Sequence, residues 1–296
     1  MIILPATNTI LRQTVFKRLS QNKKEACEFT FSDFDSVSFR VSTPLEDKES
    51  LFIEMNVPFW EDIKDVGAQE GLEKFYGDFL ESVENQTVRL KVAIDDFKDE
   101  EKSEEFSELV SNMKNNIICE VLKIRFRTVK AQAPPKAIAK IALREDTTIF
   151  VQSLNDRIFV HFALTFEGKT DKIIGNLFMS EFVETKRKLG AAPLCAFSSS
   201  PPLKLKSEID ENKYKDRTFL TLTLLPKHVE TEEKITSAAE SMLGFRQFIS
   251  YHIKSSKSYF HQRMRAQVEL MLKILNRAKV EKEKKSKTYS GKTFKR

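Results

Sequence analysis

The chain has few side chains placed for metal or cofactor chemistry. Its four histidines are scattered, and only His252 and His261 share one predicted helix. Nine residues of helix rotate the backbone by about 900°, so these two imidazoles face opposite sides. The other two, His161 and His228, have no neighbouring ligand pattern. We therefore predict neither a metal site nor a cofactor.

Catalytic patterns are also missing from the sequence. Loops that hold phosphates need glycine, because backbone N–H groups must approach the oxygens closely. The chain has only 8 glycines and contains no G-x-G-x-x-G, no G-x-x-x-x-G-K-[ST] and no glycine–serine elbow. The adjacent carboxylates at 95–96 and 104–105 belong to an acidic run that we expect to be solvated, without tuned pKa values. We predict no catalytic residue and expect a protein that is not an enzyme.

One cluster combines basic and aromatic side chains. It consists of Lys254, Lys257, His261, Arg263 and Arg265, with Tyr251, Tyr259 and Phe260 between them. Such a cluster can bind phosphates and stack on bases. It can also be the solvated face of a helix whose aromatic residues pack in a core. We favour the second interpretation, because only the C-terminal end of the chain carries net positive charge.

The net charge of +6 is concentrated in that end. Residues 279–296 hold eight Lys and Arg against two Glu, which accounts for the whole excess. Such a tail is usually solvated, and its functional alternative is contact with an acidic protein or membrane surface. We keep a basic-tailed adaptor for nucleic acid or membranes as the alternative function, although no nucleic-acid partner is expected.

Composition indicates a helix-rich globular protein with a polar surface. Apolar residues make up 41% and charged residues 31% of the 296 positions. The three cysteines are far apart and form no C-x-x-C pair, which is typical of a reducing compartment. No run is long and apolar enough for a signal sequence or a membrane span. We expect a soluble, cytoplasmic protein.

The first half reads as strands followed by helices. Strands are predicted at 28–34, 37–42, 51–57 and 88–94, and helical faces follow residue 59 and the acidic run before residue 109. The paired prolines at 134–135 suggest a domain boundary. We place the first α/β domain at 1–130.

The second half repeats this plan. Strands are predicted at 137–143, 148–153, 157–166, 172–178, 194–198 and 218–225, with a short amphipathic segment at 179–188. The predicted fold is therefore α/β in the broad, α+β sense: two similar mixed domains in tandem. The second domain is placed at 131–229, a long helix at 230–285 and a basic tail at 286–296.

The stretch from 231 to 285 predicts one very long helix. It lacks proline, and Gly244 is its only glycine. Apolar residues recur at helical spacing, and we expect a partner to bury them. The stripe consists of Ile249, Ile253, Phe260, Met264, Val268, Leu272 and Leu275. Charged residues recur on another face and are expected to stay in water.

Several motifs in this chain resemble a known family. Residues 252–265 read HIKSSKSYFHQRMR, and LNRA at 275–278 and GKTF at 291–294 follow. Upstream motifs are FSDFD at 31–35, GAQEGL at 67–72, YGDFL at 76–80, FMSEF at 178–182, PPLKLK at 201–206 and PKH at 226–228. Together they resemble subunit two of the actin-related protein 2/3 complex over nearly the whole chain.

The resemblance implies a non-catalytic scaffold that forms a core heterodimer with subunit four, alongside the other subunits. It implies binding to the side of a mother actin filament, support for nucleation of branched filaments, and a place in the actin-rich cortex and projections. No small-molecule substrate is implied. The stripe named above becomes the expected contact with the partner subunit. The expected filament contacts are Lys186, Arg187, Arg263, Arg265, Lys273 and Arg277.

The chain departs from the family pattern at two places. Thr185-Lys186-Arg187 stands where the family has Gly-Arg-Arg, so one guanidinium that could pair with a carboxylate through two hydrogen bonds is replaced by an ammonium. Residues 123–140 follow no family pattern, which leaves the linker between the two domains unspecified.

Overall fold

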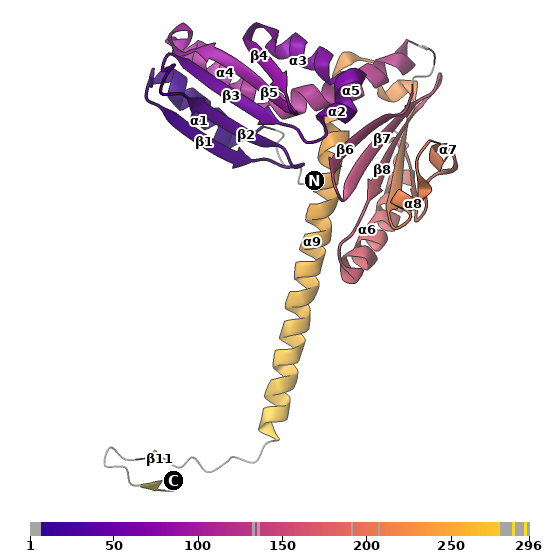
Figure 1. Ribbon diagram of the computed structural model, residues 1–296. Coiled ribbons are helices and arrows are strands. Elements are labelled where there is room, and N and C mark those ends of the chain that lie inside the picture. Colours follow the sequence, from indigo (N-terminus) through magenta and orange to yellow (C-terminus); the bar gives the residue numbers. More distant parts are fainter. Residues whose placement is uncertain are drawn as a thin grey trace. The chain divides into compact units, whose positions relative to one another are not determined.

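The computed structural model describes residues 7–131, 134, 137–190, 192–206, 208–278, 286–287 and 293–294 (Figure 1). By compactness the chain divides into two units, 1–251 and 252–296. The first unit holds two five-stranded sheets and their helices. The second holds the end of the longest helix and the short paired strands β11 (Ser286–Lys287) and β12 (Thr293–Phe294).

The first sheet is antiparallel throughout and has the order β1-β2-β3-β5-β4. Its strands are β1 (Cys27–Ser32), β2 (Ser38–Thr43), β3 (Ser50–Asn56), β4 (Leu80–Glu84) and β5 (Thr87–Ala93). Four of them lie within two residues of the predicted limits. Strand β4 was not predicted, because its side chains do not alternate between buried and exposed.

Among the described residues, five helices belong to this half of the unit. They are α1 (Thr9–Ser20), α2 (Trp60–Ile63), α3 (Ala68–Tyr76), α4 (Glu100–Ser111) and α5 (Met113–Lys130), with 3₁₀ turns η1 (Lys64–Val66), η2 (Gly77–Phe79) and η3 (Ile94–Phe97). Alternate residues of β3, among them Leu51 and Ile53, are fully buried. Helix α1 buries Leu11, Val15 and Leu19 completely. It packs against α4, and it was not predicted.

The second sheet repeats the topology of the first. Its order is β6-β7-β8-β10-β9, again antiparallel throughout. The elements are β6 (Ala139–Arg144), β7 (Thr147–Ser153), β8 (Ile158–Leu164), α6 (Lys169–Arg187), β9 (Leu194–Ser198), α7 (Leu203–Lys206), α8 (Glu211–Tyr214), β10 (Thr218–Leu224), η4 (Pro226–His228) and α9 (Glu232–Arg277). The shared strand order confirms the prediction of two similar halves followed by a long helix.

One predicted strand was wrong. Residues 172–178 belong to helix α6. The apolar residues there come in adjacent pairs, 173–174 and 177–178, four positions apart, which is helical spacing. The β-branched pair was misread as a strand signal. Gly175 allows the helix to pack closely, because a Cβ at this position would lie 2.7 Å from the Phe166 ring.

Helix α5 joins the two halves of the first unit. Thirteen of its eighteen residues are buried, including Ile117, Val121 and Phe126. It contacts α3 from the first half and strands β7 and β8 of the second sheet. Lys140 on β6 adds an ion pair with Asp62 of α2 at 3.1 Å. The domain limits at 130/131 and 229/230 stay a prediction, because the two halves pack together within one compact unit.

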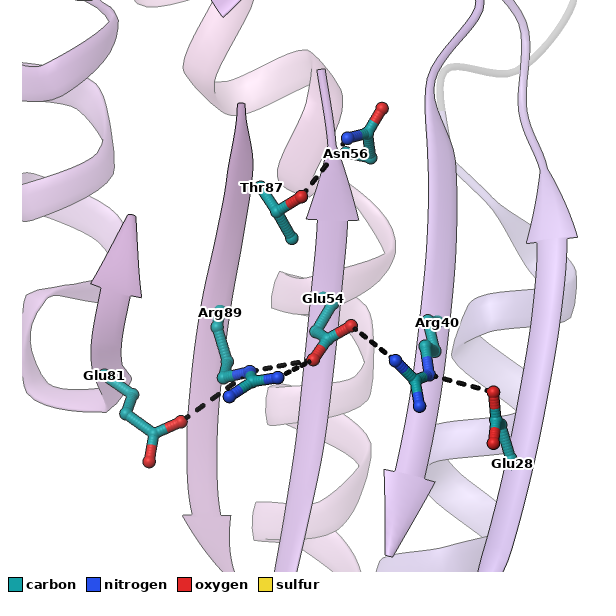
Figure 2. A network of polar contacts seen from close by, with 7 residues as sticks. All are labelled: Glu28, Arg40, Glu54, Asn56, Glu81, Thr87 and Arg89. Atoms are coloured by element: carbon teal, nitrogen blue, oxygen red, sulfur yellow. Dashed lines mark hydrogen bonds and ion pairs between the residues drawn. The ribbon is translucent and has the colours of Figure 1, made fainter. Parts of the chain in front are cut away.

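An alternating charge network crosses all five strands of the first sheet (Figure 2). Arg40 on β2 reaches Glu28 on β1 at 3.1 Å and Glu54 on β3 at 3.5 Å. Arg89 on β5 donates from Nε to Glu54 at 2.7 Å and lies 3.9 Å from Glu81 on β4. Glu54 is the nearly buried centre, whereas the outer carboxylates are solvated.

We expect Glu54→Gln to lower the free energy of unfolding by about 1–2 kcal/mol, because the two guanidinium groups lose their shared anion. Urea denaturation of the purified protein would measure the change. Glu28→Gln is the matched control at the exposed end of the network, where a loss below about 0.5 kcal/mol is expected. Equal losses in the two variants would contradict a central role for Glu54.

Candidate interaction surface on the long helix

Helix α9 begins inside the core of the first unit. Ile235, Ala239 and Ile249 are buried. Arg246 donates from Nε to Thr147 at 2.8 Å and from Nη2 to Asp146 at 2.7 Å, at the β6–β7 turn. These contacts hold the first part of the helix against the second sheet.

Local sequence explains where the helix starts and why it continues. The side chain of Thr231 accepts a hydrogen bond from the Lys234 backbone N–H at 3.2 Å. Glu232 and Glu233 occupy the first turn, where the helix dipole favours negative charge. No proline interrupts the next 46 residues. The helix ends at Arg277 with Ala278 in a turn. Residues 279–285 of the predicted helix lie outside the described residues.

The last twenty residues of the helix are exposed on all sides. Each residue from Ser258 to Arg277 is exposed, and five of the predicted stripe residues are 50–65% exposed: Phe260, Met264, Val268, Leu272 and Leu275. The other two, Ile249 and Ile253, are at most 4% exposed. Those two are thus buried by the chain itself, and the accessible apolar surface begins beyond them.

The exposed apolar surface is wider than the predicted stripe. At about 100° per residue, Met271 falls between Phe260 and Met264, within the predicted stripe. Leu270 and Ile274, both more than half exposed, extend it on the Phe260 side. We call these eight side chains, 260, 264, 268, 270, 271, 272, 274 and 275, the apolar arc. It covers roughly 200° of the helix, about twice the width of an ordinary amphipathic face.

The predicted filament-contact residues fall into three settings. Lys186 and Arg187 are on α6; Arg187 pairs with Glu184 at 2.6 Å, and Lys186 lies 5.4 Å from the centre of the Phe182 ring. By helical rotation, Arg265, Lys273 and Arg277 share the polar side of α9 with Glu269. Arg263 falls between Leu270 and Ile274, with its guanidinium 5.6 Å from the Tyr259 ring centre. It therefore belongs to the edge of the apolar arc.

The other chemically interesting side chains are dispersed or buried. Within the described part of the chain, no three His, Cys, Asp or Glu side chains are placed to hold a metal ion. Burial raises the pKa of Cys119 to about 12 and that of Cys195 to about 11, which disfavours the reactive thiolates. None of the helices that the structure describes is long and apolar enough to span a bilayer.

Comparison with known proteins agrees with this architecture. A body of repeated sheets that carries a helix with an uncovered apolar arc is typical of proteins that assemble with others. Residues 53–282 match the family described as Arp2/3 complex, 34 kD subunit p34-Arc, which is most of the chain. The chain belongs to this family.

Two relatives align over nearly their full length. An actin-related protein 2/3 complex subunit 2 from Schizosaccharomyces pombe is 28% identical, with 99% of each chain covered. A protein of the same name from Dictyostelium discoideum is 29% identical, with 100% of this chain and 99% of the relative covered.

The buried His161 on β8 gives the fold a pH dependence. Burial lowers the pKa of His161 from 6.5 to about 4, and its Nδ1 lies 2.8 Å from the Thr221 hydroxyl. The unfolded chain therefore binds a proton at higher pH than the folded one. The stability contributed by neutral His161 is complete above about pH 7 and is lost as the pH falls from 6.5 toward 4.

We expect this group to remove about 2 kcal/mol from the free energy of unfolding between pH 7.5 and pH 5. Urea denaturation at the two pH values would measure the loss. In His161→Gln, the free energy of unfolding should fall by about 2 kcal/mol less between these two pH values, because glutamine does not titrate. The same pH dependence in both proteins would contradict this assignment.

Proposed function

We propose that the chain is a non-catalytic scaffold subunit of an Arp2/3 complex. The observation that carries the proposal is the uncovered apolar arc on α9, in a chain whose family is defined by such a subunit. Burying half-exposed Leu, Met and Phe side chains stabilises an interface by on the order of 1 kcal/mol each. The arc therefore supplies much of the driving force for assembly.

The partner for the arc is the corresponding helix of subunit four. A long helix presents a straight row of side chains, which another long helix can match over many turns. The arc runs from Phe260 to Leu275, four turns of helix. Its width of roughly 200° exceeds what one helix covers, so other subunits of the complex cover part of it.

The polar side of the same helix is the proposed contact with the actin filament. Arg265, Lys273 and Arg277 present three cations there, accompanied by Glu269. Lys186 and Arg187 supply two more cations in the first unit. Such exposed charges act mainly on encounter and orientation. In this role the subunit binds the side of a mother filament and supports nucleation of branched filaments in the cytoplasmic actin cytoskeleton, at the cortex and in projections.

We expect Leu272→Asp with Leu275→Asp to abolish assembly with subunit four, because two carboxylates would enter a dry interface. Co-expression followed by size-exclusion chromatography would measure it, and circular dichroism would show that the chain stays folded. Gln262→Asp with Asn276→Asp is the matched control, since it adds the same charges on the polar side. Normal assembly of the leucine variant would overturn the interface.

We expect Arg265→Glu with Lys273→Glu to leave assembly intact and to weaken co-sedimentation of the complex with actin filaments several-fold, more at low salt than at high salt. Lys213→Glu with Lys215→Glu, on and just after α8, changes the net charge equally and should leave filament binding unchanged. Arg263→Glu is tested separately, because we expect this edge residue to affect assembly. If the α8 variant weakens filament binding equally, the effect comes from the net charge and not from the proposed contact.

A further inference from the structure

A cavity of about 850 Å³ opens between helices α6 and α9 in the first unit. Its walls come from α6, the loop to β9, strand β10, turn η4 and the first part of α9. Among its lining residues, only Lys186 takes part in a function proposed above. Its volume lies in the range of cavities that hold one small organic ligand.

The floor of the cavity is aromatic. Phe182 lies 5.2 Å from Phe245 between ring centres, and Phe245 lies 6.1 Å from Phe248. Leu222, Leu224 and Met242 line it as well. Phe182, Phe245 and Phe248 are only partly buried, so a ligand that covers them removes apolar area from water.

On the α9 side, the cavity is lined by two small residues, Gly244 and Ala238, which leave space for a ligand. Gly244 is the only glycine in the 46 residues of α9, and a glycine inside a helix costs about 1 kcal/mol relative to alanine. Both positions line the cavity, with the hydroxyls of Ser237 and Ser241 beside them. Larger side chains at the two small residues would fill the space.

The charged residues that line the cavity are all basic. Lys186, Lys227 and Lys234 lie around the cavity, and among its described lining residues none is acidic. Lys227 donates to the Gly190 carbonyl oxygen at 3.3 Å, and Lys234 pairs with Glu230 at 2.7 Å. Lys227, Lys234 and Glu230 are exposed, so these contacts are weak enough to exchange for a buried anionic group. The half-buried Lys186 already lies beside the Phe182 ring.

We propose that this cavity binds a small amphiphilic anion, with an aromatic or aliphatic body on the phenylalanine floor and a carboxylate, sulfonate or phosphate group at the lysines. The three lysines attract an anionic head group and repel cations, and the apolar floor disfavours neutral polar molecules. The occupant is a monomer from solution. The proposal concerns the first unit alone and does not depend on the partner subunit or the filament.

Titration of the purified complex with 8-anilinonaphthalene-1-sulfonate, an aromatic sulfonate that fluoresces when its surroundings become apolar, tests the site. We expect one saturable site per copy of this chain. Ala238→Trp should abolish that site by filling the cavity. Lys227→Glu with Lys234→Glu should weaken probe binding at least tenfold, with a smaller dependence on salt than in the wild type.

Two controls match these variants. Thr185→Trp places the same ring on an exposed position of α6 outside the cavity lining, and Lys169→Glu with Lys172→Glu changes the same charge at the start of α6. Both should bind the probe normally. Saturable binding that survives Ala238→Trp overturns the proposal. A wild-type complex that shows no such saturable site also overturns it, because the cavity would then be covered by another subunit. Binding to phosphatidylserine vesicles without binding of the monomeric probe would also overturn it.

Discussion

The constraint on which the structure depends is that α9 is one uninterrupted helix with two environments. Its first part completes the core of the first unit, where Ile235, Ala239 and Ile249 are buried and Arg246 is fixed to Asp146 and Thr147. Its last part keeps the same apolar periodicity while its side chains remain exposed. A helix satisfies its own backbone hydrogen bonds, so the exposed part needs no sheet or loop to support it. Only its apolar side chains require another surface.

The first unit is built from two sheets with the same strand order. The two sheets lie in one compact unit, and α5 packs against α3 of the first half and against β7 and β8 of the second sheet. The charge network centred on Glu54 crosses the first sheet, and the second sheet binds Arg246 through the turn at 146–147. Core packing thus fixes both sheets, and these polar contacts tie neighbouring strands and the long helix to them.

Much of this fold could be predicted from alternation and spacing. The strand at Thr87–Ala93 alternates between buried and exposed residues, and it was found. Strand β4 does not alternate, so it was missed, and adjacent isoleucines in α6 imitated a strand. The apolar stripe followed from helical spacing, yet it omitted Met271, which lies four residues before Leu275 and on the same face. The burial of Ile249 and Ile253 depends on tertiary packing, which one helix pattern does not contain. The cavity between α6 and α9 was out of reach, since its lining is assembled from five separate segments.

The two proposed binding surfaces differ in the physics that selects their partners. The apolar arc is convex and spread over four turns, so it gains energy only from a partner that matches it over a similar length, which means a protein. The cavity is concave, small and ringed by lysines, so a compact anion can gain both apolar contact and charge pairing within one ligand. Because the arc lies in the second unit and the cavity in the first, changes at Leu272 and at Ala238 test independent properties of the chain.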